Sequence, residues 1–158
     1  MPLRFAVYFN SLIAEIHKKN MSYKYLEHST DAFIEVKAKT LEEAFSVAGK
    51  SVVETIIDLK NIQQIEEKSI EVKGRNLLNL LYNWLEEIVT ITITDGFAIK
   101  KFSVNIKKNT EYEIVSKVSG EKLDLKKHGF KVEIKSPTFH LMEIKENNGV
   151  TMQYLLDL

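Results

Sequence analysis

The stretch AFIEVKAKTLEEAFSVAGKSVVETIIDL, residues 32–59, decides the fold, because its hydrophobic period changes from that of a strand to that of a helix. Residues 32–39 alternate apolar and charged side chains, as expected of a β-strand with one buried face. From Leu41 to about Leu59 apolar residues recur at helical spacing, which predicts a helix packed on a sheet. Thr40 and Glu43 have capping-box spacing, so the helix should begin directly after Thr40.

Outward from this stretch, the pattern predicts one further helix and many strands. Tyr23 and Tyr25 hint at a strand before residue 32, Ile70 and Val72 indicate another after the helix, and residues 77–88 carry a second apolar helical stripe. From Thr90 onward alternating segments predict strands near residues 90–94, 97–107, 111–119, 130–135, 139–146 and 149–156. Turn signals separate them at Asp95-Gly96, Ser119-Gly120, His128-Gly129 and Asn147-Asn148-Gly149. We therefore expect a single-domain α+β fold with both helices packed on one face of a largely antiparallel sheet.

Composition narrows the classes of function. The chain has 158 residues, of which 44% are hydrophobic and 28% charged, as in an ordered globular domain. It has no cysteine, which excludes disulfides and thiolate sites, and a reducing cytoplasm is the working assumption. Its 22 basic and 22 acidic residues balance, which disfavours a nucleic-acid reader, and no glycine-rich phosphate loop occurs.

We interpret residues 1–21 as an N-terminal extension and residues 22–158 as the domain. The apolar stretch at residues 3–8 is too short to span a membrane and has poor signal-peptide character. Met21 could equally be the natural start.

Two polar clusters at opposite ends of the domain are candidate sites. Residues 27–31 contain His28 and Asp31, which could present an imidazole and a carboxylate together or could only satisfy turn amides. At the other end, Asp157 precedes Leu158 and its terminal carboxylate, and two anionic groups so close together repel unless a cation shares them. This pair suits a hard divalent metal, although a solvated, frayed end is the alternative.

A third cluster lies in the loop at residues 120–129, which holds Glu121, Asp124 and His128 among lysines. A metal or acid–base role is conceivable, and so is a merely solvated loop. Residues 98–135 carry ten lysines against five acids, so part of the sheet could face a phosphate backbone. Strand lysines equally serve to keep edges unpaired. His140, at a strand entry, is expected to be structural.

Several motifs, in order along the chain, resemble those of the archease family: Tyr25-Leu-Glu-His28-Ser-Thr-Asp31, Thr40-Leu-Glu-Glu-Ala-Phe45, Trp84-Leu-Glu-Glu87, Gly120-Glu-Lys-Leu-Asp124, His128, Lys135-Ser-Pro-Thr-Phe-His140 and Leu156-Asp157-Leu158. The similarity covers about residues 22–158. Ser29-Thr30 and Ser136-Pro137 depart from the residues that are commonest in the family.

The resemblance implies an accessory protein rather than an enzyme, one that promotes guanylylation and multiple turnover of a GTP-dependent tRNA-splicing RNA ligase. It implies a divalent-metal site, for calcium, magnesium or manganese, at Asp31, Asp157 and Leu158. Supporting or partner-binding roles fall to His28, Glu121, Asp124, His128, Lys135 and His140. The ligase is the expected partner and tRNA could be met through the ligase complex, whereas membranes and DNA are not expected. A metal-independent, chaperone-like binding module and a stand-alone metal-dependent hydrolase are the alternatives.

Overall fold

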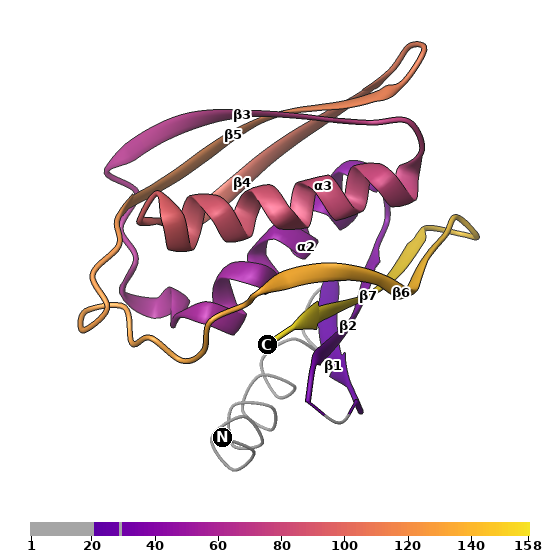
Figure 1. Cartoon of the computed structure of the whole chain (residues 1–158). Coiled ribbons are helices and arrows are strands. Elements are labelled where there is room, and N and C mark those ends of the chain that lie inside the picture. The colour runs from indigo at the N-terminus through magenta and orange to yellow at the C-terminus, as the bar shows by residue number, and fades with distance from the viewer. Residues whose placement is uncertain (1–20, 29) are drawn as a thin grey trace.

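A computed structural model describes residues 21–28 and 30–158 of the chain, arranged as two antiparallel sheets with two α-helices (Figure 1). Sheet A has the strand order β1 (Ser22–Leu26), β2 (Ala32–Ala38), β7 (Val150–Asp157) and β6 (Ser136–Lys145). Sheet B has the order β3 (Glu66–Gly74), β5 (Tyr112–Lys122) and β4 (Phe97–Lys108). The predicted α+β class is confirmed, but the strands form two sheets instead of one.

The two helices form a layer between the sheets, as Figure 1 shows. α2 (Leu41–Ile56) contacts β2 on one side and β4 on the other, and α3 (Leu77–Val89) contacts both β6 and β3. Each helix therefore buries two faces, one against sheet A and one against sheet B. The apolar surface of each helix is correspondingly wider than a single stripe of residues. Trp84 is fully buried, and its indole N–H joins the helices by donating to the Phe45 carbonyl at 2.8 Å.

The boundary between strand and helix at Thr40 is as predicted. Thr40 Oγ1 accepts a hydrogen bond from the Glu43 amide at 3.2 Å, and the Glu43 carboxylate accepts from the Lys39 amide at 3.1 Å. The helix ends at Ile56, before the predicted Leu59, and a short 3-10 turn, η1 (Leu59–Asn61), follows it.

The predicted strand at residues 90–94 is wrong. This segment is a π-helical turn, η2 (Thr90–Thr94), that continues α3. Its alternating sequence suits a strand, but Ile91 is buried and the Thr92 hydroxyl donates to the Ile88 carbonyl at 2.8 Å, so tertiary packing overrides local propensity. Asp95-Gly96 therefore ends a helix and does not turn a hairpin.

Residues 130–135 also form no strand, contrary to the prediction. Val132 and Ile134 are buried, as alternation requires. The backbone, however, bonds to two different elements, with the Lys131 amide donating to the Ile56 carbonyl at 2.7 Å and the Lys135 amide to the Asp157 carbonyl at 2.8 Å. The segment is a connector that ties α2 to the end of β7.

The predicted chain break at Ser119-Gly120 lies inside β5. A Cβ at Gly120 would stand 1.8 Å from the Ala98 carbonyl oxygen, beside the register shift between Ile99 and Lys101. Glycine is needed here for close strand approach and not for a turn. The predicted turn at Asn147-Asn148-Gly149 is confirmed, because it joins the paired antiparallel strands β6 and β7.

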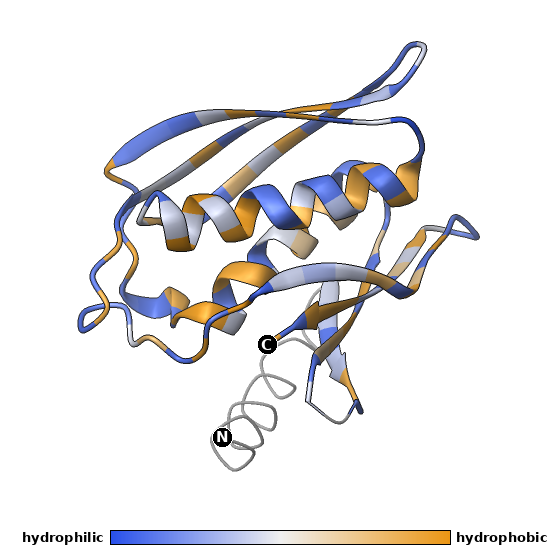
Figure 2. Cartoon of the chain, in the orientation of Figure 1, coloured by the Kyte–Doolittle hydropathy of each residue, from blue (hydrophilic) through white to orange (hydrophobic). Residues whose placement is uncertain are grey.

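The strands alternate hydrophobic and hydrophilic residues along their length, which Figure 2 shows by colour. Polar groups also enter the layer between sheet A and α2, where Tyr154 bonds Ser51 at 2.5 Å, Tyr25 bonds Thr55 at 2.7 Å and Tyr23 bonds Glu54. Burial raises the pKa of all three phenols, so they remain protonated. Among the described residues, no helix is long and apolar enough to cross a membrane.

Candidate functional site

Asp31 and Asp157 lie at the same end of sheet A, although they are far apart in the sequence. β2 pairs with β7 in a register that opposes Ala32 to Leu156. Asp31 directly precedes β2, and Asp157 directly follows Leu156 in β7. The sheet thus brings to one end the two residues that the family resemblance implies as metal ligands.

Leu158 is held beside this pair rather than trailing. It is half-buried and packs against the core, and β7 is an interior strand between β2 and β6. Asp157 is opposed on its other side by Ser136, and its carbonyl accepts from the Lys135 amide. The alternative of a frayed C-terminal end is therefore excluded for residues 150–157, and Lys135 lies at this site through its backbone.

His28 lies on the Asp31 side of the site. Its Nδ1 is 3.7 Å from the Asp31 carboxylate, and its ring meets Phe33 edge-on with centroids 6.2 Å apart. The Asp31 side chain keeps 22% of its surface exposed, and that of His28 keeps 29%. Both groups are therefore accessible to a ligand or partner.

The chemistry of this cluster fits a hard cation. Within the described chain, neither Asp31 nor Asp157 forms an ion pair with a lysine or arginine. Nor do the described residues contain three His, Asp or Glu side chains grouped as a metal site. A metal held here would need the terminal carboxylate at Leu158 as its third anionic ligand, and carboxylate oxygens are the donors that calcium, magnesium and manganese prefer.

Glu121, Asp124 and His128 form a separate cluster at the loop after β5. His128 is fully buried, and its Nε2 lies 2.7 Å from Glu121 Oε1. The same oxygen accepts from Lys127 Nζ at 2.7 Å and from the Gln63 amide at 3.2 Å. These hydrogen bonds, led by that from Lys127, lower the pKa of the Glu121 carboxyl to about 2.

The partners of His128 define its protonation state. The Asp124 amide donates to Nδ1 at 3.0 Å, so Nδ1 carries no proton. The proton then lies on Nε2 and is donated to Glu121, which makes the ring neutral. The Asp124 carboxylate accepts from the Lys126 and Lys127 amides, which lower its pKa.

This cluster holds the loop in place. The His128 carbonyl accepts from the Asp58 amide at 2.7 Å, which joins the loop to the end of α2. Because Glu121 Oε1 already has three donors and His128 has no exposed surface, the geometry favours a structural role over a metal or acid–base role.

His140 joins neither cluster. It lies exposed on β6, within the irregular pairing between Thr138 and Glu143, and its amide donates to Thr138 Oγ1 at 3.1 Å. The described residues show no contact that links its side chain to either site. The structure leaves it as a surface residue.

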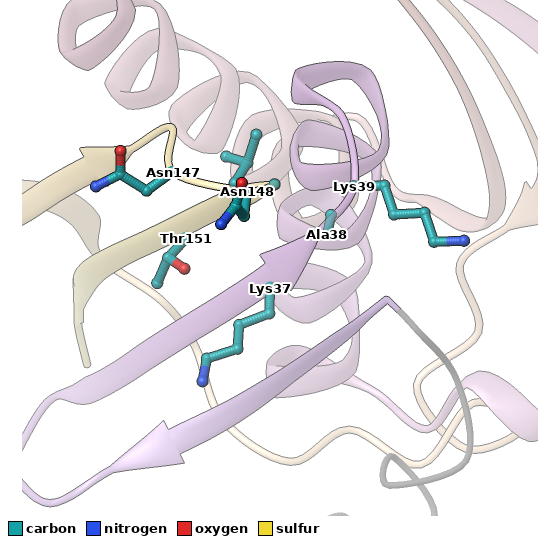
Figure 3. A pocket seen from close by; sticks show the side chains of 8 residues that line it. Lys37, Ala38, Lys39, Asn147, Asn148 and Thr151 are labelled. Carbon is teal, nitrogen blue, oxygen red and sulfur yellow. The ribbon is translucent and has the colours of Figure 1, made fainter.

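A polar pocket of about 490 Å³ at the opposite end of sheet A was not predicted (Figure 3). It lies where the end of β2 meets the β6–β7 turn and is lined by Lys37, Ala38, Lys39, Asn147, Asn148, Gly149, Val150 and Thr151. The lysines at the end of β2 and the turn at residues 147–149 are both visible in the sequence, but their proximity in space is not. They meet because β7, which follows the turn, pairs with β2.

Comparison with known proteins identifies similar chains. The model of the archease protein family matches residues 23–158. Protein archease of Pyrococcus abyssi is 35% identical over 125 residues, covering 78% of this chain and 88% of that protein. Protein archease of Methanosarcina barkeri is 36% identical over 139 residues, covering 86% and 95%.

Two solved structures share the fold. Protein 1598 of Methanobacterium thermoautotrophicum aligns with a TM-score of 0.73 and 29% identity, covering 86% of this chain and 98% of its own. A Thermotoga maritima protein, described as an archease and possible chaperone, aligns with a TM-score of 0.56 and 20% identity, covering 85% and 96%. At the latter identity the likeness concerns the fold alone.

Proposed function

Because this chain belongs to the archease family, we propose that it activates a GTP-dependent tRNA-splicing RNA ligase by promoting guanylylation and repeated turnover of that enzyme. The observation that supports the proposal is the pairing of β2 with β7, in which Ala32 lies opposite Leu156, so that Asp31 and Asp157 are the next residue of each segment at one end of sheet A. The His28 and Asp31 side chains are partly exposed, and within the described residues neither Asp31 nor Asp157 pairs with a lysine or arginine.

Asp31, Asp157 and the terminal carboxylate at Leu158 would hold one divalent cation in this proposal. Such a cation would neutralise phosphate charge during nucleotidyl transfer when the site meets the ligase. The His28 ring lies 3.7 Å from the Asp31 carboxylate, and the Lys135 amide donates to the Asp157 carbonyl. The pairing of β2 with β7 keeps Asp31 and Asp157 at neighbouring ends of the sheet.

The proposed role is activation of a partner and not independent catalysis. In the Glu121–His128 cluster no base is available to activate a nucleophile, because His128 is committed to Glu121 and to the Asp124 amide. The ligase would perform the chemistry, and this protein would complete or order the site at which it occurs.

Replacing Asp31 or Asp157 with Ala tests the proposal. Each change removes a charged oxygen ligand, so calorimetric titration with Mg²⁺, Mn²⁺ and Ca²⁺ should show at least a tenfold loss of affinity. Multiple-turnover ligation and ligase guanylylation should fall in parallel. Asn should rescue poorly because it restores a neutral oxygen but no charge.

Asp95→Ala serves as the matched control, since it removes an exposed aspartate from the turn after η2. Circular dichroism should show that all variants fold. Folded Asp31 and Asp157 variants that stimulate the ligase as well as the parent would contradict the proposal.

A chaperone-like binding role without metal is the second candidate, suggested by the description of the Thermotoga maritima relative as a possible chaperone. Under that alternative, the Asp31 and Asp157 variants would retain ligase stimulation in chelator-treated buffer. Incubation with generic phosphodiester substrates tests the hydrolase alternative, for which we expect no turnover.

A further inference from the structure

The pocket at the basic end of sheet A is built by close packing of a turn on a strand end. Asn148 has a φ of 50° and Gly149 a φ of 111°, so the turn curls in the left-handed region. A Cβ at Gly149 would lie 2.8 Å from the Ala38 carbonyl oxygen. The turn is therefore seated on the end of β2, where Asn147, Asn148 and Lys37 line one pocket (Figure 3).

A row of polar side chains crosses the sheet at this end. Thr151 of β7 is paired with Lys37 of β2 on one side and with Lys145 of β6 on the other. Directly paired residues share a face, so two lysines flank one hydroxyl on the outer face of sheet A. Lys39, two residues beyond Lys37, also lines the pocket, and its ammonium group extends away from it (Figure 3).

These lysines can be redirected toward a ligand. The Lys37 and Lys145 side chains keep 64% and 66% of their surface exposed. Lys145 lies 3.5 Å from Glu143, and an ion pair between two exposed side chains contributes little. Lys37 is 3.9 Å from the largely covered Glu35, which pairs more closely with Lys24 at 3.2 Å and would keep that partner if Lys37 moved.

The two ends of sheet A differ in charge. Asp31, just before β2, and Asp157 of β7 lie at one end, and Lys37 of β2 and Lys145 of β6 lie at the other. At the rise of an extended chain the two ends are roughly 20 Å apart. The net charge of the protein, which is zero, does not reveal this separation of acidic and basic residues.

We propose that the pocket formed by Lys37, Lys39, Asn147, Asn148 and Thr151, together with Lys145, binds the phosphate backbone of a single-stranded RNA segment. Ammonium, amide and hydroxyl donors are the groups that proteins use on phosphate oxygens. The pocket has no aromatic lining residue on which a base could stack. Recognition is therefore of the backbone and independent of base sequence.

A strand fits this site better than a single phosphate. In Figure 3 the Lys37 side chain extends to the Thr151 side of the pocket, whereas Lys39 extends away from it. Diverging ammonium groups suit successive phosphates of one chain rather than one compact ion. The inference rests on the proposed function in one respect: RNA held here would be a strand on which the partner ligase acts.

The test measures RNA binding without any ligase, so its failure is distinct from failure of ligase activation. A fluorescein-labelled oligouridylate is titrated with the full chain, and anisotropy is followed at several salt concentrations. Three lysine contacts predict a slope of about −2 in log affinity against log salt, which is a roughly twentyfold loss between about 50 and 200 mM salt.

The decisive variant combines Lys37→Gln, Lys39→Gln and Lys145→Gln, and we expect at least a tenfold loss of affinity at low salt with a slope near zero. The matched control, Lys101→Gln with Lys107→Gln and Lys117→Gln, removes the same charge from exposed positions of sheet B and should bind nearly as the parent does. Equal losses in both variants, or no measurable binding by the parent, would overturn the proposal.

Competition separates the sources of anionic charge. Unlabelled oligouridylate should displace the probe at far lower concentration than inorganic phosphate or poly-glutamate of equal charge. Displacement by inorganic phosphate at the same phosphate concentration would indicate a small-anion site instead. Equal displacement by poly-glutamate would indicate an acidic protein surface, and either result would contradict an RNA strand as the ligand.

Discussion

At the Glu121 carboxylate, one oxygen accepts hydrogen bonds from Lys127, His128 and the Gln63 amide. These donors favour the charged form and lower its pKa to about 2. A depressed folded-state pKa contributes stability above the unfolded value, near 4.3, and that contribution is lost as the pH falls toward 2.

We therefore expect Glu121→Gln to flatten the acid dependence of stability. The parent should lose melting temperature between about pH 4.5 and pH 2. The variant should be less stable at neutral pH and change less across that window. Thermal unfolding followed at a series of pH values measures both. Parallel pH profiles would show that Glu121 does not supply this dependence.

His128 should be among the most sensitive single positions. Replacing it with Ala removes one of the three donors to Glu121 Oε1, leaves the Asp124 amide without its acceptor and opens a buried space, at a cost of about 2–3 kcal/mol. Urea unfolding gives the change in free energy, and His140→Ala, at an exposed position, should be close to neutral. A near-neutral His128→Ala would show that the ring does not hold the loop.

The sequence identified these residues but not their roles. Glu121, Asp124 and His128 were candidates for a site, yet their partners include Gln63 and Asp58, which lie far earlier in the chain. Asp31 and Asp157 could be paired only through the family resemblance, because nothing in local spacing relates the two ends of a domain. Strand order supplies that relation.

Among the elements, long segments with one clear period were predicted correctly, and short ambiguous ones were not. The Thr40 cap and both helices follow from spacing alone. The alternation of threonine and isoleucine at residues 90–94 predicts a strand. The segment is helical instead, because it continues α3 and buries Ile91. Residues 130–135 alternate in burial without a neighbouring strand to complete a ladder.

Gly120→Ala should destabilise the β4–β5 pairing. The new methyl would meet the Ala98 carbonyl at 1.8 Å, which forces the strands apart at a cost of about 3 kcal/mol. Gly96→Ala is the control, because its φ of 64° strains a side chain but no atom lies within 4 Å, so about 1 kcal/mol is expected. Chemical denaturation of both variants gives the loss of unfolding free energy for each. A larger loss for Gly96→Ala than for Gly120→Ala would refute the argument that the strands approach closely at Gly120.

For the whole molecule, the wide apolar surfaces of α2 and α3 require two sheets, whereas composition and period alone favoured one. A helical stripe shows which residues are buried, but not whether one or two layers cover them. The number of sheets follows from strand pairing, which links segments more than 100 residues apart, such as Ile34 with Tyr154.

Deleting residues 1–20, which lie outside the described residues, should leave ligase activation intact, since every recognised motif begins at Tyr25 or later. The measurement is multiple-turnover ligation with full-length and shortened proteins at equal concentration, with thermal unfolding as a control for folding. Loss of activation by a folded, shortened protein would assign the extension to the functional surface.

The position of β7 has a consequence for how sheet A forms. β7 lies in the interior of sheet A, between β2 and β6. Until β7 docks, the edges of β2 and β6 that it will join both lack partners, and exposed edges invite aggregation and proteolysis. A folding intermediate with β7 detached is therefore vulnerable at two edges at once, and docking of the strand that carries Asp157 closes both.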